Sequence, residues 1–175
     1  MARRLGLELT QTYSPKACRG FPSVDGSDCE RMEDLSLLYV GISPRAFPKN
    51  GKPLSKQTLR SRIRYHYRGN ASGSTLRLTL GCLLSEKLGI KLRRVGSGER
   101  RAFSQGEQLL SEWMESNALI CWAECDTPWI VEEQLIKTLS LPLNLDQNGH
   151  HLFCSSLRAI RKKAKDRARE LPVVL

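Results

Sequence analysis

The chain has 175 residues, of which 40% are hydrophobic, so it is long enough for one domain with a buried core. Its formal net charge of +10 favours a polyanionic partner and excludes one that is itself strongly basic. The apolar runs are too short for a membrane-spanning helix. The N-terminal residues lack the long apolar stretch of a signal peptide, and the six cysteines include no CxxC pair. Together these features predict a cytoplasmic protein with free thiols.

The N-terminal part of the chain predicts an irregular segment followed by one buried strand. Residues 1–34 mix glycine, proline, aspartate and serine without a sustained hydrophobic period. Residues 35–43 are dense in apolar and β-favouring side chains and are followed by Pro44. This pattern predicts a buried strand that ends at a loop.

Two helices are predicted after that loop. Ser55 can cap the first helix, and Gly69 with Asn70 ends it. The apolar residues of this first helix recur at helical spacing, at Leu59, Ile63 and Tyr67. The polar turn over 69–74 then opens a second helix that continues through Leu84.

A hairpin, a third helix and a strand are predicted next. Residues 90–103 alternate around a Gly-Ser-Gly turn, which is typical of a β-hairpin. Ser104 and Glu107 have the spacing of a capping box for a helix that ends near Asn117. Residues 118–124 predict a strand.

The last two predicted elements are helices. Pro128 fits the first turn of a helix that ends before Pro142, and residues 155–169 form a basic helix with one narrow apolar stripe. This order of elements predicts an α+β domain, with a small central β-sheet flanked by helices and an additional C-terminal basic helix. We expect three regions: an irregular segment over 1–34, a core over 35–149, and a basic helix within 150–175 packed on that core.

Charge is distributed unevenly along the chain. Residues 45–101 hold fifteen Lys or Arg against two acidic residues, and residues 158–175 hold seven against two. Residues 102–157 reverse the balance, with eight acidic residues and a single base. A metal-using nuclease needs such a division, because cations bind phosphates and a carboxylate holds the metal ion. A basic surface with unrelated acidic helices explains the charge count equally well.

The penultimate predicted helix places one carboxylate on an apolar face. Residues three and four apart share one side of a helix, so Glu132 lies with Leu135 and Ile136. Glu133 is instead spaced to pair with Lys137 on the solvent side. A carboxylate on an apolar face loses hydration unless a cation compensates, so Glu132 is a candidate partner for a divalent metal ion or an arginine. The alternative is a boundary position that reaches water.

The first predicted helix carries two sets of basic residues. Arg62 and His66 share a face with Leu59, where an arginine can clamp a phosphate and a histidine can relay a proton. Taken alone, His66 is better interpreted as a structural histidine. A second row, on another face, consists of Arg60, Arg64 and Arg68. This row suits contacts with a phosphate backbone, or it is an ordinary solvated face.

The segment over 69–77, GNASGSTLR, combines small residues with the start of a helix. The free N–H groups at such a start attract anions, so we favour a phosphate-contacting loop over a plain capped turn. Its candidate contacts are Asn70, Ser72, Ser74, Thr75 and Arg77.

Four fragments within residues 38–144 resemble the GIY-YIG nucleases and occur in the order found in that family. The family's Tyr-Ile-Gly signature is similar to residues 39–41 (YVG), and its Leu-x-x-Arg-apolar helix is similar to residues 59–63 (LRSRI). Its Glu-x-x-Leu-Ile fragment resembles residues 132–136, and its Pro-x-Asn fragment resembles residues 142–144. The family's metal-binding glutamate corresponds to Glu132, the same residue that helical spacing places on an apolar face.

The resemblance implies a nuclease that hydrolyses phosphodiester bonds with Mg²⁺ or Mn²⁺. Glu132 would hold the metal ion, and Arg62 would stabilise charge on the phosphate. Tyr39, directly or through His66, would take a proton from the attacking water. Asn144 would hydrogen-bond the Glu132 or substrate side of the pocket. The catalytic set that the resemblance implies is Tyr39, Arg62, His66, Glu132 and Asn144, with Glu132 as the metal ligand.

Two features depart from the family's pattern or extend it. The first signature, Gly-Ile-Tyr, has no counterpart at a comfortable distance before Tyr39, so the site uses Tyr39 alone, recruits Tyr13, or is weakened. Gly41, two residues after Tyr39, joins the expected substrate-binding set. The insertion between Gly41 and Leu59 is rich in proline and lysine, and resembles a substrate-binding elaboration, with a tolerated surface loop as the alternative.

Nucleic acid, with DNA as the expected substrate, is the predicted partner, and no membrane partner is expected. A non-catalytic nucleic-acid-binding protein on a degenerate scaffold of the same family is the main alternative. Glu132 together with Asn144 argues against it, because a carboxylate repels phosphate unless a metal ion intervenes. A ribosomal or assembly protein predicts charged disordered tails rather than a series of capped, core-forming helices.

Overall fold

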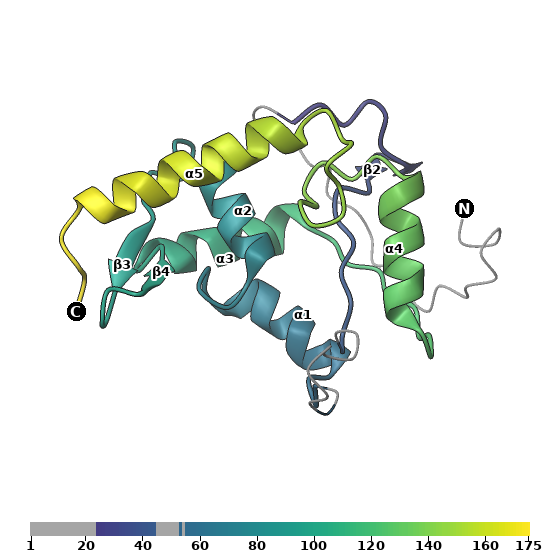
Figure 1. Ribbon diagram of the computed structural model, residues 1–175, viewed down its shortest axis with the longest axis horizontal. Coiled ribbons are helices and arrows are strands. Elements are labelled where there is room, and N and C mark those ends of the chain that lie inside the picture. The colour runs from purple at the N-terminus through teal and green to yellow at the C-terminus, as the bar shows by residue number, and fades with distance from the viewer. Residues whose placement is uncertain (1–23, 45–52, 54) are drawn as a thin grey trace.

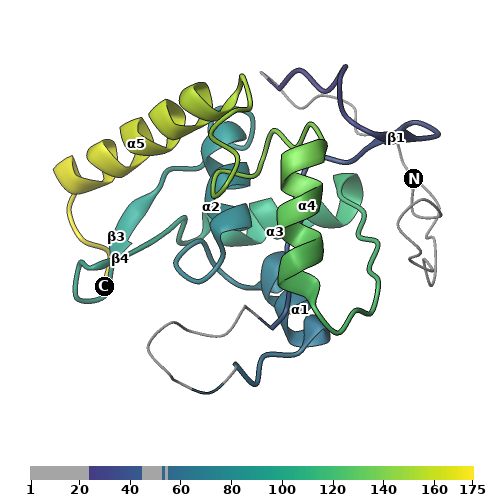
Figure 2. The same cartoon turned by 45° about the vertical axis from the view of Figure 1, so that its right-hand side comes forward.

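The computed structural model describes residues 24–44, 53 and 55–175. Five helices lie in these residues: α1 (Leu59–Arg68), α2 (Thr75–Leu83), α3 (Gly106–Asn117), α4 (Pro128–Thr138) and α5 (Cys154–Glu170). Figure 1 shows α5 along one side of the molecule and α1 on the opposite side, with α2 and α3 between them. The α4 helix lies apart from α5, as the turned view in Figure 2 also shows. None of the helices in these residues combines the length and the apolar character needed to cross a membrane.

The β structure of the described residues consists of two small antiparallel sheets. The strand β1 (Arg31–Met32) pairs with β2 (Leu35–Ser36), and β3 (Arg93–Val95) pairs with β4 (Arg100–Ala102). Val95 also forms a parallel bridge with Val174, which brings the C-terminal end beside β3. The α+β class and the hairpin within 90–103 are therefore confirmed. The expectation of one central sheet is not met in these residues, because the two pairs remain separate.

Two predicted strands are wrong as regular elements. Only residues 35–36 of the predicted 35–43 strand form a ladder. The N–H of Leu37 still donates to the Glu30 carbonyl at 2.9 Å, but Leu38 and Val40 bond to the backbone amide of Leu143 and the side chain of Asn144 instead. Residues 118–124 contain no strand. The carbonyl of Ala118 accepts a hydrogen bond from the Tyr67 hydroxyl at 2.8 Å, so it is occupied by a side chain rather than by a neighbouring strand.

The helix boundaries follow the sequence signals, with two exceptions at the caps. The side chain of Thr58, and not that of Ser55, caps α1 by accepting the N–H of Ser61 at 3.2 Å. The predicted capping box at the start of α3 does not form, because Glu107 Oε1 accepts the N–H of Phe103 at 2.9 Å instead. Gly69 ends α1 and a proline lies in the first turn of α4, as predicted.

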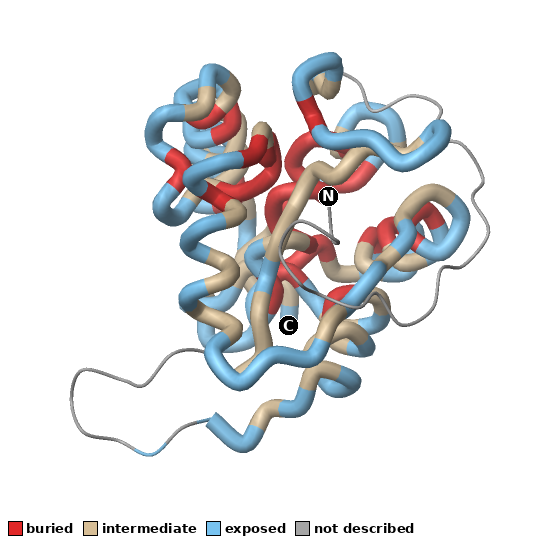
Figure 3. Tube along the Cα trace, turned by 90° about the vertical axis from the view of Figure 1, so that its right-hand side faces the viewer, coloured by how far each residue is buried: buried red, intermediate tan, exposed pale blue. Residues whose placement is uncertain are grey.

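Two clusters of buried apolar side chains hold the chain together, and in Figure 3 the buried segments gather in the interior. The main cluster joins α2, α3 and α5, and its most buried members are Leu84, Leu110, Met114, Leu157 and Ala168. The small cluster joins α4 to the following loop through Ile136, Leu139 and Leu141. Residues 37–40 run between the two clusters: Leu38 and Tyr39 pack on the main one, and Leu37 and Val40 pack on the small one. Apolar burial on both sides therefore fixes the segment that carries Tyr39.

Candidate active site

The phenol of Tyr39 lies where three elements meet. Burial raises its pKa, and the guanidinium of Arg62 on α1 lowers it both as a nearby charge and as a hydrogen-bond donor. The carboxylates of Glu132 on α4 and Asp146 raise the pKa again. The net direction is upward, so Tyr39 is a neutral phenol at neutral pH. One arginine and two carboxylates from distant parts of the sequence thus act on a single hydroxyl group.

Asn144 holds the Tyr39 segment in place. Its Oδ1 accepts the N–H of Val40, and its Nδ2 donates to the carbonyl of Val40, both at 2.9 Å. The side-chain amide thereby acts as a second peptide group, and the N–H of Leu143 adds a hydrogen bond to the Leu38 carbonyl at 3.0 Å. Asn144 is 6% exposed. The expected contact with Glu132 or substrate is therefore corrected: Asn144 positions the residue next to Tyr39, because both ends of its amide bind Val40.

Arg62 and His66 lie on one face of α1, as their spacing predicted. Nη1 of Arg62 donates to the carbonyl of Gly73 at 3.5 Å, which orients the guanidinium beside the loop before α2. The ring of His66 is buried and meets the ring of Tyr39 edge to face, with 6.3 Å between the ring centroids. Tyr39, Arg62 and His66 therefore form one contiguous group.

His66 is neutral at physiological pH. Burial lowers its pKa from 6.5 to about 4, and the charges of Arg62 and Arg77 act in the same direction. Its Nδ1 lies 2.7 Å from the hydroxyl of Ser74, which in turn accepts the N–H of Arg77 at 3.1 Å. The histidine is thus both structural and adjacent to the site, and it is uncharged in its resting state.

The lowered pKa of His66 predicts a loss of stability in mild acid. The unfolded chain binds a proton at pH 6.5, whereas the folded chain resists it until about pH 4. The stabilisation is therefore complete above pH 6.5 and disappears as the pH falls toward 4, at a cost of about 3 kcal/mol. Denaturant unfolding of the wild type and His66→Asn between pH 7 and 4 measures it. Asparagine keeps a polar partner for Ser74 but does not titrate, so an equally steep decline in the variant would contradict this assignment.

Glu132 lies on α4 and is partly exposed. Its neighbour Glu133 forms the predicted solvent-side pair with Lys137, with 2.6 Å between Oε1 and Nζ. The residues of the described ranges contain no group of three or more His, Cys, Asp or Glu side chains that could enclose a metal ion. A site with fewer protein ligands still fits Mg²⁺, because this ion keeps most of its bound waters and needs only one or two carboxylates. Glu132 and Asp146, whose charges both raise the pKa of Tyr39, are the candidate carboxylates for such an ion.

Gly41 is required by its closeness to the phenol. A Cβ built at this position would lie 2.9 Å from Cε1 and 3.1 Å from the hydroxyl oxygen of Tyr39. We expect Gly41→Ala to lower the cleavage rate by about 10- to 100-fold, because displacing a reacting group by about 1 Å has an effect of this size. Gly149→Ala is the control, because a Cβ there meets nothing within 4 Å. Initial rates and unfolding midpoints measured together test this, and an active Gly41→Ala would show that the Tyr39 position is not critical.

The predicted arginine row of α1 is exposed. Arg60, Arg64 and Arg68 all reach solvent, and Arg68 pairs loosely with Glu115 at 3.5 Å. In the loop before α2 the side chains of Asn70, Ser72 and Thr75 are also exposed. Asn70 Oδ1 already accepts the Tyr65 hydroxyl at 3.2 Å and the N–H of Gly73 at 3.3 Å. The surface beside Arg62 thus keeps a basic and hydroxyl-bearing character.

Two members of the expected phosphate-binding loop are placed elsewhere. Arg77 is fully buried, and all five of its N–H groups are used within the protein, chiefly by the carboxylate and carbonyl of Glu107. The side chain of Ser74 is also buried, where it caps α2 and contacts His66. The expectation that these side chains bind substrate is wrong, because neither can reach a ligand. Arg77 instead ties α2 to α3 and, through the carbonyls of His66 and Tyr67, to α1.

Sequence reasoning missed Asp146, which lies two residues after Asn144 and acts on Tyr39. The only signal was its position just beyond the Pro-x-Asn fragment. His151, in the loop before α5, is held by hydrogen bonds to Phe153 and Ser140. Its Nδ1 accepts the N–H of Phe153 at 3.1 Å, so its Nε2 carries the proton and donates to Ser140, 3.0 Å away. This histidine cannot activate Ser140 as a nucleophile.

A comparison with family models identifies the class of protein. The model described as the GIY-YIG catalytic domain matches residues 21–163, which is more than half of the chain. The chain therefore belongs to the GIY-YIG nuclease superfamily. Comparisons with curated proteins and with solved structures find no match. A nuclease-type function and a nucleic-acid substrate follow from the family at this general level. Tyr13 and most of the proline-rich insertion lie outside the described residues.

Proposed function

We propose that this protein is a divalent-metal-dependent endonuclease that hydrolyses phosphodiester bonds in nucleic acid, with DNA as its substrate. The observation that carries the proposal is the convergence on Tyr39: Arg62 and Glu132, which lie on α1 and α4, both act on its hydroxyl group. A cation that can bind phosphate, a carboxylate and a phenol are thereby available to one substrate atom.

Mg²⁺ or Mn²⁺ is the proposed cofactor, in keeping with the general use of divalent metals by GIY-YIG nucleases. Glu132 would hold it, and Asp146, whose charge also acts on Tyr39, is a second candidate ligand. When bound, the ion supplies positive charge that stabilises the phosphate and leaving-group oxygens. The same positive charge opposes the effect of the two carboxylates on Tyr39, and would lower the pKa of the phenol toward the range in which it exchanges a proton.

The residues of this chain divide the remaining work. Arg62 binds the scissile phosphate through its fork of donors, which matches phosphate geometry. Tyr39 holds or moves the proton of the attacking water at its hydroxyl oxygen. His66, neutral and buried, packs against the Tyr39 ring and fixes its orientation. Arg60 and Arg64 on the exposed face of α1 bind the backbone on either side.

A cleavage assay tests the proposal. Supercoiled plasmid, single-stranded DNA and structured RNA are each incubated with the protein in Mg²⁺ and, separately, in excess chelator. We expect nicked or linear products from at least one DNA substrate in Mg²⁺ and none in chelator. Binding without cleavage under every metal condition would instead support the alternative, a nucleic-acid-binding protein on a degenerate GIY-YIG scaffold.

A further inference from the structure

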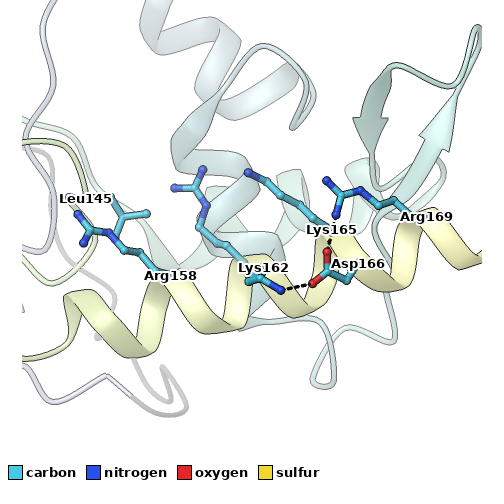
Figure 4. Close-up of a pocket in the computed structure, with 7 residues that line it drawn as sticks. Leu145, Arg158, Lys162, Lys165, Asp166 and Arg169 are labelled. Carbon is cyan, nitrogen blue, oxygen red and sulfur yellow. Dashed lines mark hydrogen bonds and ion pairs between the residues drawn. The ribbon is translucent and has the colours of Figure 1, made fainter.

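A basic groove of about 320 Å³ lies along α5, away from the residues assigned to cleavage. Its α5 wall is formed by Arg158, Arg161, Lys162, Lys165, Asp166 and Arg169. Leu145, from the loop that precedes α5, closes one end, as Figure 4 shows. Five cations and one acid therefore face a single hollow.

The spacing of these cations makes them a continuous strip. Arg158, Lys165 and Arg169 are separated by seven and four residues, so they fall on one face of the helix. Figure 4 shows their side chains leaving α5 on the same side. At 1.5 Å per residue the strip is about 16 Å long, over which one nucleic-acid strand presents about five phosphates. The length and the charge thus suit a sugar-phosphate strand.

Part of this charge has no direct ion-pair partner among the described residues. Asp166 pairs with Lys162 at 2.8 Å and with Arg169 at 2.6 Å, so these two cations share one negative charge. In the part of the chain that the structure describes, Arg158, Arg161 and Lys165 form no ion pair. Arg161 is half-buried and makes one long hydrogen bond, 3.4 Å, to the hydroxyl of Thr79. Burial lowers the pKa of its guanidinium, and the charge of Asp146 acts in the opposite direction.

The groove is connected to the candidate active site by one short loop. Leu145 directly follows Asn144, which is bonded to Val40 next to Tyr39. Asp146, the next residue, acts electrostatically on both Tyr39 and Arg161. The loop over residues 144–146 therefore links the candidate active site to one end of the groove.

We propose that the α5 groove is a second binding surface for nucleic acid, which holds the phosphate backbone of the substrate beyond the point of cleavage through Arg158, Arg161 and Lys165. This inference rests on the proposed function only in naming a point of cleavage. Binding of nucleic acid in the groove needs neither cleavage nor a metal ion. An acidic protein is the competing occupant, and the strip length and the path from Tyr39 favour nucleic acid.

Two double variants of α5 test the groove. Arg158→Ala/Lys165→Ala removes two groove cations, and Lys163→Ala/Arg167→Ala removes two exposed cations of the same helix that do not line the groove. Both are made in a Glu132→Gln background and measured in chelator, so that no substrate is cut. Binding of a fluorescent DNA duplex is followed from 50 to 300 mM salt, and unfolding midpoints show whether each variant is folded.

We expect the slope of log K against log salt, where K is the association constant for DNA, to become less steep by about two in the groove variant. Each lost phosphate contact lowers the steepness of this slope by about 0.9. The control variant is expected to change the slope by less than half of that. Equal effects of the two variants, or no effect of the groove variant, would overturn the proposal. Competition by poly-glutamate as strong as that by DNA of equal charge would also overturn it, in favour of an acidic protein.

The outcomes separate this proposal from the proposed function. Cleavage by the wild type, together with unchanged binding by the groove variant, would reject the groove and retain the nuclease. Groove-dependent binding by a wild type that cuts no substrate would reject the nuclease and retain the groove.

Discussion

Glu132→Gln is expected to lower the Mg²⁺-dependent cleavage rate by a factor on the order of 10³ or more, because a bound metal ion supplies several kcal/mol of transition-state stabilisation. Glutamine keeps the size and polarity of the side chain but lacks the charge that holds a divalent ion. Single-turnover rates at saturating Mg²⁺ measure the loss. Glu133→Gln is the matched control, because the Glu133 carboxylate pairs with Lys137 on the solvent side. This substitution should leave the cleavage rate within about twofold of the wild type.

The same substitution has a second readout that does not depend on cleavage. The Glu132 carboxylate raises the pKa of Tyr39, so its removal should lower that pKa. Titration of ¹³C-labelled tyrosine by NMR, with Tyr39→Phe to assign the resonance, measures the shift without metal or substrate. An unchanged pKa would mean that the two groups do not share a site. Full activity of Glu132→Gln would remove this residue from the mechanism, even if the protein remained a nuclease.

Arg77→Met is expected to lower the free energy of unfolding by about 3–5 kcal/mol, because it leaves the carboxylate of Glu107 without its buried counterion. It also leaves the carbonyls of His66 and Tyr67 without the donor that links α1 to α2. Chemical denaturation at neutral pH measures the loss. Arg60→Met, on the exposed face of α1, should change the stability by less than about 0.5 kcal/mol.

A double variant shows how much of that loss comes from charge. In Arg77→Met/Glu107→Gln both charges are removed, and the glutamine oxygen can still accept the N–H groups of Ala71 and Phe103. We expect the double variant to be more stable than Arg77→Met alone, as is found when both members of a buried pair are replaced. A double variant less stable than Arg77→Met would show that the Glu107 carboxylate has other partners that matter more. Nucleic-acid binding by the folded double variant should be unchanged, because Arg77 cannot reach a ligand.

Local patterns in the sequence were sufficient to locate the helices and the charged rows. The periods that predicted α1, α4 and α5 depend only on residues three and four apart, and the structure has these helices within a few residues of the expected ends. The pairing of Glu133 with Lys137 followed from the same spacing. The placement of Glu132 on the other side of α4, toward Tyr39, followed as well.

Contacts between distant residues decided the parts that were predicted wrongly. Residues 37–40 looked like a strand because they are apolar, but their burial comes from two clusters on either side. Beyond Leu37, which bonds to Glu30, their hydrogen bonds come from Leu143 and Asn144. Arg77 resembled a phosphate ligand because it follows a small-residue loop. A carboxylate thirty residues later, Glu107, takes its guanidinium into the core.

The sequence by itself indicated the family, the α+β class, the helices, and the tyrosine, arginine and glutamate that are proposed for the site. Only the tertiary structure decided that Asn144 binds backbone, that Ser74 contacts His66, and that Asp146 reaches Tyr39. The physical reason is that periodicity reports which side of an element is apolar, whereas the partner of a polar side chain depends on which distant segment packs against that side.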